Sequence, residues 1–136
     1  MKTVFSSAPL RLSFAGGGSD IEPFCSEYGG AVLNACISKY VYAEVSQIAG
    51  PSELVSLDTG LKESFIPSAN VSNQTLSLHR QALEYFLTYF GGKKLGSVRI
   101  RTFSESPPSS GLGSSSSLMV AIVAGLAELG GETWTP

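Results

Sequence analysis

A glycine- and serine-rich stretch at residues 107–117 carries the groups best suited to chemistry. It reads PPSSGLGSSSS, with glycines at positions 111 and 113. Glycine allows a backbone with positive φ and a close approach to a ligand. The serines stand where a helix would begin, so hydroxyls and unpaired backbone N–H groups converge on one point. Such a point suits a phosphate group.

The segment that follows decides between a binding loop and a linker. A serine run alone is typical of a flexible linker. Residues 118–129, however, are apolar nearly all round, which predicts a buried helix that holds the loop in place. The loop has no lysine after its second glycine, as the commonest phosphate loop requires, and it lacks the third glycine of a dinucleotide fingerprint.

This stretch resembles the nucleotide-phosphate motif of the GHMP kinase superfamily, which includes galactokinase, homoserine kinase, mevalonate kinase and phosphomevalonate kinase. The resemblance implies that the loop binds ATP with Mg²⁺. Chemistry alone lets a hydroxyl of Ser114 or Ser115 reach the metal, and the resemblance favours Ser115. The ATP-binding residues that it implies are Pro108, Ser110, Gly111, Leu112, Gly113, Ser114, Ser115 and Ser116.

A second candidate site is the glycine turn near the N-terminus, in the segment APLRLSFAGGGSD at residues 8–20. One glycine usually suffices for a turn, so three in a row favour a close approach to a ligand. Asp20 could contact that ligand or could cap a helix over residues 21–28. Ser19 competes for the capping position.

The same segment resembles the N-terminal GHMP motif, in which an arginine and an aspartate flank a glycine turn at the phosphoryl-acceptor site. Galactokinases have Glu-His-Thr-Asp in this turn, whereas this chain has Gly-Gly-Ser-Asp. The triple glycine, the segment YGGAVLNA at 28–35 and LHR at 78–80 resemble the branch that contains D-glycero-D-manno-heptose 7-phosphate kinases. The acceptor-binding residues implied are Arg11, Gly17, Gly18, Ser19 and Asp20.

Alternating strand and helix patterns must position these residues. Strands are predicted at 3–14, 31–46, 54–57, 64–66 and 97–103, and the main helices at 74–90 and 115–129. Pro9 is expected to divide the first region into two short strands, and the 54–66 region to form an edge hairpin. We expect an α/β (α+β) fold, a mixed sheet with helices on one face, resembling the GHMP N-terminal (ribosomal protein S5 domain 2-like) domain over residues 1–136.

Two isolated basic residues receive structural interpretations. His79 has no second histidine or carboxylate at ligand spacing, which favours a place on the surface or in the packing of its helix over metal binding. Lys39 is expected to be a solvated strand end rather than a substrate contact.

Composition limits the partners. The chain has 136 residues, 43% of them apolar, enough for the core of one domain. A net charge of −2 without a basic run argues against nucleic acid. Cys25 and Cys36 suggest neither a disulfide framework nor a zinc site, so a reduced, cytoplasmic setting is predicted. No apolar run reaches membrane-spanning length, so no membrane partner is expected, and a homodimer is possible.

The resemblance implies an ATP-dependent sugar kinase that phosphorylates the anomeric hydroxyl of D-glycero-D-manno-heptose 7-phosphate. The alternatives are an L-fucokinase-like or other GHMP small-molecule kinase, and a non-catalytic nucleotide- or sugar-phosphate-binding domain. Phosphoryl transfer also needs a group that positions or deprotonates the acceptor. The resemblance places that base after the loop, where Glu128 and Glu132 match no motif. The base and the C-terminal domain are therefore expected beyond Pro136, and residues 1–136 alone are expected to be inactive.

Overall fold

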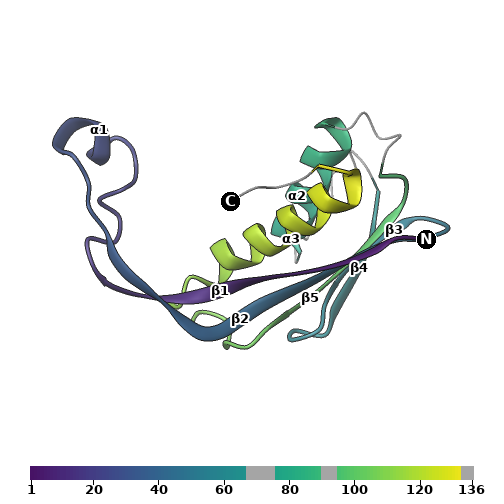
Figure 1. The fold of residues 1–136 in the computed structure, drawn as a ribbon, viewed down its shortest axis with the longest axis horizontal. Helices are drawn as coiled ribbons and strands as arrows, with labels where there is room; N and C mark the ends of the chain where they lie inside the picture. Colours follow the sequence, from purple (N-terminus) through teal and green to yellow (C-terminus); the bar gives the residue numbers. More distant parts are fainter. Residues whose placement is uncertain (67–75, 90–94, 133–136) are drawn as a thin grey trace.

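The computed structural model describes residues 1–66, 76–89 and 95–132, which form one mixed sheet with helices on one face (Figure 1). The strands are β1 (Thr3–Ala15), β2 (Leu33–Gln47), β3 (Ser52–Ser56), β4 (Leu61–Phe65) and β5 (Val98–Ser104). The helices are α1 (Phe24–Tyr28), α2 (Ser77–Tyr89) and α3 (Ser114–Gly130). The expected fold class is confirmed. The outermost predicted residues of α2, at 74–75 and 90, lie outside the described residues.

The five strands lie in the order β1-β2-β5-β3-β4. Every neighbouring pair is antiparallel except β3 and β5, which are parallel. A parallel pair needs a crossover connection, and α2 lies in the connection that brings the chain from β4 back to β5. The predicted edge hairpin is confirmed, because β3 and β4 pair with each other and β4 lies at the edge.

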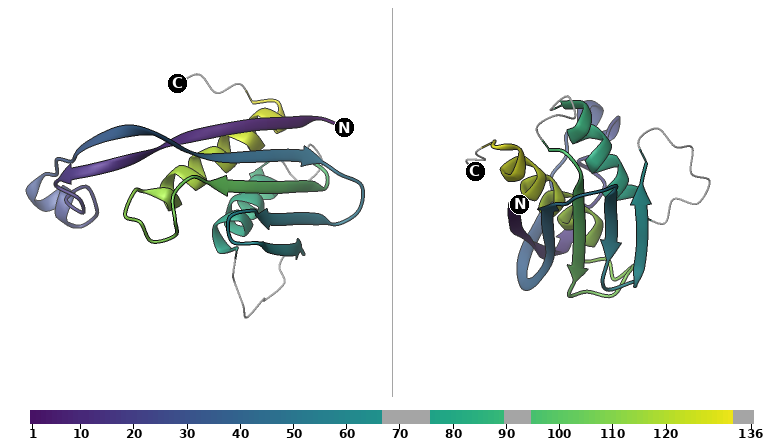
Figure 2. Two further views of the ribbon diagram at one scale, coloured as in Figure 1. Left: turned by 90° about the horizontal axis from the view of Figure 1, so that it is seen from below. Right: turned by 90° about the vertical axis from the view of Figure 1, so that its right-hand side faces the viewer.

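The core lies between the sheet and the two long helices (Figure 2). On β2, Val41, Ala43 and Val45 face this core and are at most 2% exposed, whereas Tyr42 points away, as the alternation predicts. Helix α3 is buried along one side only, because Val120 is 59% exposed. The predicted buried helix is therefore confirmed on the side that faces the sheet, whereas its outer side is exposed.

Strand β1 continues through Pro9, so the prediction of two short strands was wrong. Pro9 cannot donate to a sheet ladder, but β1 lies at the edge of the sheet that the described strands form, next to β2. The pairing register of β1 with β2 also shifts between Pro9 and Arg11, as at a β-bulge, so the ladder continues past the proline. The free edge at Pro9 instead faces α3, where the Ser117 hydroxyl donates to the Pro9 carbonyl at 2.8 Å.

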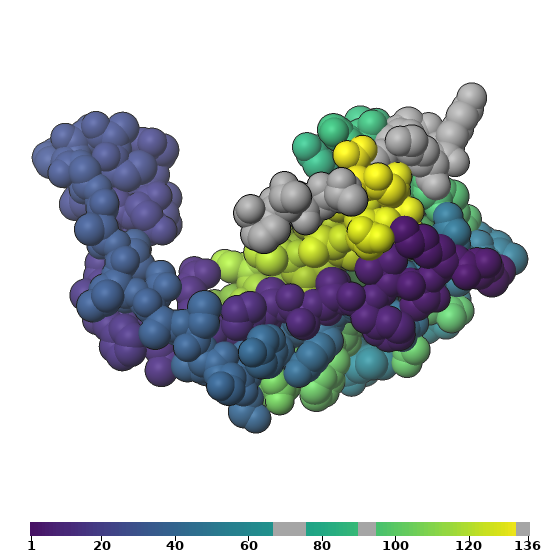
Figure 3. All heavy atoms as spheres, viewed as in Figure 1, coloured from purple at the N-terminus to yellow at the C-terminus, as the bar shows by residue number. Residues whose placement is uncertain are grey.

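Residues 12–36 form an arm that extends away from the rest of the domain, with α1 at its tip (Figures 1 and 3). None of these residues is buried. Helix α1 begins later than expected, at Phe24, and Pro23 occupies its N-cap position. The capping role considered for Asp20 was therefore wrong.

None of the helices in the described part of the chain combines the length and apolar character needed to cross a membrane.

Candidate functional site

The serine loop, residues 105–113, connects β5 to the start of α3. Ser109, Gly111 and Gly113 have positive φ values of 61°, 73° and 71°. The first hydrogen bond of α3 runs from the Ser117 N–H to the Gly113 carbonyl at 3.0 Å. The N–H groups of residues 114–116 therefore have no acceptor within the helix. No side chain in the described part of the chain caps this end.

Strand β1 holds the loop from the other side. The Arg11 N–H donates to the Leu112 carbonyl at 3.0 Å. The Arg11 side chain packs against Gly113, where an added Cβ would come within 3.2 Å of Arg11 Cγ. The structure thus brings Arg11 of one candidate motif into contact with Leu112 and Gly113 of the other, although about a hundred residues separate them.

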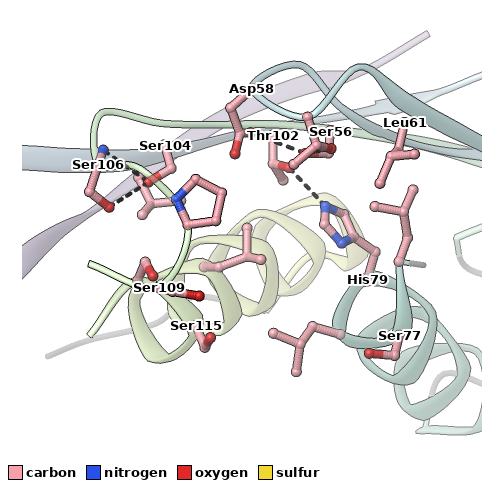
Figure 4. Close-up of a pocket in the computed structure, with 17 residues that line it drawn as sticks. Ser56, Asp58, Leu61, Ser77, His79, Thr102, Ser104, Ser106, Ser109 and Ser115 are labelled. Carbon is pink, nitrogen blue, oxygen red and sulfur yellow. Dashed lines mark hydrogen bonds between the residues drawn. The ribbon is translucent and has the colours of Figure 1, made fainter. Parts of the chain in front are cut away.

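A pocket of about 330 Å³ opens between the serine loop, the β3–β4 turn and the starts of α2 and α3 (Figure 4). Of the predicted ATP-binding residues, Pro108, Ser114 and Ser115 line it. The other lining residues are Val41, Ser56, Asp58, Thr59, Leu61, Leu76, Ser77, Leu78, His79, Thr102, Ser104, Ser106, Ser109 and Leu118. Hydroxyl groups dominate the polar lining, and aliphatic side chains supply the apolar part.

His79 forms part of the pocket wall. It is 3% exposed, and its Nε2 lies 2.8 Å from Oγ1 of Thr102 on β5. Burial lowers the pKa of its imidazole below the ordinary range, although the nearby Asp58 and Glu63 carboxylates oppose this effect. Of the two structural roles expected for His79, packing is confirmed over surface exposure. Its position in the pocket wall was not predicted.

Arg80 fixes the helix that carries His79. Its side chain is 7% exposed, pairs with Glu63 of β4 at 3.6 Å and stacks 5.1 Å from the Phe65 ring centre. It also donates to the Ile66 carbonyl at 3.3 Å. A buried cation with an ion-pair partner, a ring face and a carbonyl is well compensated. These contacts attach the start of α2 to the sheet edge.

The β3–β4 turn contributes a polar cluster that the sequence analysis missed. The Thr59 hydroxyl donates to Ser56 Oγ at 2.7 Å, and the Ser56 hydroxyl donates to Asp58 Oδ1 at 3.1 Å. The clue in the sequence was a carboxylate and two hydroxyls within four residues of a hairpin turn.

The other predicted acceptor residues, Gly17, Gly18, Ser19 and Asp20, lie on the arm, away from the pocket (Figure 1). The close approach expected at the triple glycine is made by the chain itself at Gly16. An added Cβ there would lie 1.8 Å from the Ala31 carbonyl oxygen. Ser19 braces the same contact, since its Oγ accepts from the Ala31 N–H at 3.1 Å.

Lys39 on β2 lies near Glu105, where the serine loop begins. Lys39 lies inside β2, so its expected place at a strand end was wrong. Its side chain is 58% exposed and lies 3.5 Å from Glu105, which confirms the solvated position. Glu105 also accepts from the Tyr40 N–H at 2.7 Å, which fixes the start of the serine loop to β2.

Comparison with known proteins gives a consistent set of relatives. Residues 77–136 match the family model described as the GHMP kinases N terminal domain. The chain is 35% identical over 130 residues to D-glycero-alpha-D-manno-heptose 7-phosphate kinase from Campylobacter jejuni. This alignment covers 94% of the chain and 38% of the relative.

Two solved structures resemble the fold closely. A D-glycero-D-manno-heptose 1-phosphate kinase from Bacteroides thetaiotaomicron superposes with a TM-score of 0.79 at 32% identity, covering 93% of this chain and 42% of that one. The mevalonate kinase of Methanococcus jannaschii gives a TM-score of 0.78 at 17% identity, covering 98% and 42%, and shares the fold. The chain spans about two-fifths of the length of these relatives.

Proposed function

We propose, from the premise that this chain carries the N-terminal domain of the GHMP kinases, that it binds ATP at the serine loop and serves a kinase that phosphorylates a sugar phosphate. One observation carries the ATP site. The uncapped N-terminus of the 17-residue helix α3, preceded by left-handed Gly111 and Gly113, lies beside a pocket of about 330 Å³. The partial positive charge and free N–H groups of a helix N-terminus bind phosphate.

The donors at this end fit a triphosphate with Mg²⁺. The N–H groups of residues 114–116 would hold phosphate oxygens, and the Ser115 hydroxyl would contact the metal. Within the described residues, no group of three His, Cys, Asp or Glu side chains could hold a metal ion. Mg²⁺ would contact phosphate oxygens as well as the Ser115 hydroxyl, and it would neutralise charge on the transferred group.

The acceptor proposal concerns the hollow between the arm and α3 (Figure 3). Arg11 lies where the arm leaves the domain, beside Gly113. Its guanidinium pairs with none of the carboxylates in the described ranges, so it remains available for an anionic group of the acceptor. We place Gly17, Gly18, Ser19 and Asp20 at the other side of this acceptor site.

We propose D-glycero-D-manno-heptose 7-phosphate as the acceptor and its anomeric hydroxyl as the group phosphorylated. The 35% identical relative is named for this substrate, and the GGGSD turn supports the same branch. The alternatives are fucose as the acceptor, and binding without phosphoryl transfer. A kinase assay with each sugar distinguishes them.

The first test is Gly113→Val, measured by calorimetry with MgATP. Valine at this φ of 71° would be strained, and its side chain would push against Arg11 and obstruct the backbone N–H groups. We expect at least a tenfold loss of affinity. Gly96→Val is the matched control, because Gly96 has a φ of 63° with open space around it. Unchanged affinity in a folded Gly113→Val protein would overturn the ATP site.

The second test is turnover by residues 1–136, followed as ADP release with ATP and heptose 7-phosphate. Glu128 cannot act as the base, because it pairs with Lys2 at 3.3 Å and lies about 20 Å along α3 from the loop. We expect binding without turnover. Positioning and electrostatic groups supply most of the catalysis of phosphoryl transfer, and the base among them is expected beyond Pro136. Robust turnover would mean that a catalytic group within these residues has been overlooked.

A further inference from the structure

We propose that Asp58, on the turn between β3 and β4, recognises the nucleoside half of the nucleotide by accepting a hydrogen bond from it. The donor is a ribose hydroxyl or the exocyclic amine of the base. This proposal rests on the proposed function, because it assumes that the phosphates occupy the serine-loop end of the same pocket.

The pocket has two chemically different ends. Ser109, Ser114 and Ser115 lie at the end formed by the serine loop and α3. Asp58 and His79 lie toward the β3–β4 turn and α2 (Figure 4). A volume of about 330 Å³ is in the range of small-molecule sites and exceeds what a phosphate group alone would fill. A nucleotide with its phosphates at α3 would therefore extend its nucleoside toward Asp58.

Asp58 is held ready to accept a hydrogen bond. Figure 4 shows its carboxylate directed toward the pocket. The hydroxyl chain from Thr59 through Ser56 to Asp58 Oδ1 orients the carboxylate and occupies only part of its accepting capacity. An ionised carboxylate can accept about four hydrogen bonds and donates none. It therefore selects ligand groups that carry hydrogen, which phosphate oxygens at neutral pH mostly do not.

Charge also fixes the direction in which the nucleotide lies. Across the described ranges, neither lysine nor arginine forms an ion pair with Asp58. Its negative charge would repel a triphosphate, whereas the start of α3 attracts one. The two ends therefore favour the same orientation, with phosphates at the serine loop and the nucleoside at the turn.

The walls beside Asp58 suit a flat, mostly apolar group. Leu61 and Leu76 are among the apolar residues that line the pocket, and His79 is held in place by Thr102. Burial lowers the pKa of His79 and so favours the uncharged form of its ring. A purine could pack on these surfaces while one of its edges, or its ribose, meets Asp58.

The test compares Asp58→Ala with wild type in calorimetric titrations of the full chain. Each protein is titrated, in the presence of Mg²⁺, with ATP, 2′-deoxy-ATP, 3′-deoxy-ATP, purine riboside triphosphate and inorganic triphosphate. Glu27→Ala is the matched control, because it removes one exposed carboxylate from α1, on the arm. We expect Asp58→Ala to weaken ATP about tenfold, typical of a charge-assisted hydrogen bond, and to leave inorganic triphosphate unchanged or slightly tighter.

The analogues identify the donor. Suppose that wild type binds a deoxy analogue as weakly as the Asp58→Ala protein binds ATP. The hydroxyl missing from that analogue is then the donor to Asp58. The same result with purine riboside triphosphate, which lacks the amine, places the donor on the base. Unchanged ATP affinity in Asp58→Ala, equal weakening of ATP and inorganic triphosphate, or wild-type affinity that no analogue alters would each overturn the proposal.

The two proposals fail in different ways. If wild type binds inorganic triphosphate as tightly as ATP, the nucleoside contributes nothing, and the role of Asp58 is overturned while the phosphate site stands. If wild type binds neither ligand, the proposed function itself fails, and the role of Asp58 fails with it.

Discussion

His79 combines deep burial with a titratable ring and a hydrogen bond to Thr102. Since burial lowers its pKa, the native protein resists protonation at a pH where the unfolded chain accepts a proton. The unfolded state then binds more protons than the native state over the interval that begins near the ordinary histidine pKa, about 6.5, and extends downward. Stability from this group is therefore complete at neutral pH and is lost as the pH falls through that interval.

We therefore predict that His79→Gln makes the free energy of unfolding less sensitive to acid. Glutamine does not titrate, and its amide can still bond to Thr102. Urea unfolding at about pH 7.5 and about pH 5.5 should show a smaller loss of stability for the variant than for wild type. An equal loss in both proteins would mean that other groups cause the acid sensitivity.

At the level of single residues, the sequence predicts the serine loop better than the rest of the pocket. Gly111 and Gly113 are informative locally, because positive φ is a property of a residue and its neighbours. Asp58 gave no such signal. Its place beside the pocket depends on the parallel pairing of β3 with β5 and on the packing of α2, and both bring together residues distant in the chain. The ligand-binding roles of Arg11 and the arm residues stay predictions.

Helix α3 packs against the β1–β2 pair at a position where only glycine fits. A Cβ on Gly125 would lie 2.7 Å from Val45 Cγ2 and 3.1 Å from Ser6 Oγ. Val45 is fully buried, and its β-branched side chain has little freedom to move. The Ser6 hydroxyl donates to the Ala121 carbonyl at 2.6 Å, so it is fixed as well.

We predict that Gly125→Ala destabilises the protein by about 1–2 kcal/mol, measured as the free energy of unfolding in urea. Overpacking a core costs about 1–3 kcal/mol, and alanine regains at most about 1 kcal/mol through its higher helix propensity. Val120→Ala, at an exposed position of the same helix, should change stability by less than about 0.5 kcal/mol. A Gly125→Ala protein as stable as wild type would show that the helix can move away from the sheet at little cost.

The elements themselves were largely predictable because their signals are periodic. The alternation at Val41, Ala43 and Val45 is typical of a strand and matches β2, and β5 lies within one residue of its predicted range. The prediction for β1 was wrong because proline interrupts a central strand but is tolerated in an edge strand. The local sequence does not show that β1 lies at the edge of the sheet. The late start of α1 at Phe24 has a similar cause, since Ser19 bonds across the arm instead of capping a helix.

On the scale of the whole molecule, the arm gathers several exposed large hydrophobic side chains, and grouped exposed apolar residues are typical of interaction surfaces. Its exposed large hydrophobic residues are Leu12, Phe14, Ile21, Phe24, Tyr28 and Leu33. Their exposure ranges from 42% to 74%. An apolar surface of this kind favours burial against another protein surface.

We predict that residues 1–136 self-associate through the arm as their concentration rises, which sedimentation velocity would detect. Phe14→Ser should shift the association to higher concentration, because Phe14 is 64% exposed on the arm. Phe5→Ser is the matched control, since Phe5 is 76% exposed on the same strand but outside the arm. A protein that stays monomeric at all concentrations, or an equal effect of both variants, would contradict this role of the arm.

The packing of α3 against the first strands has a consequence for synthesis on the ribosome. Strands β1 and β2 are made first, yet part of the cover over Val45 is α3, the last element of the described chain. At about 5–20 residues per second, the interval between them lasts on the order of ten seconds. During that time the nascent hairpin presents its apolar face without its helix. Chaperones that act during translation would therefore meet this face first, because the proposed phosphate-binding end of the pocket forms only when α3 emerges.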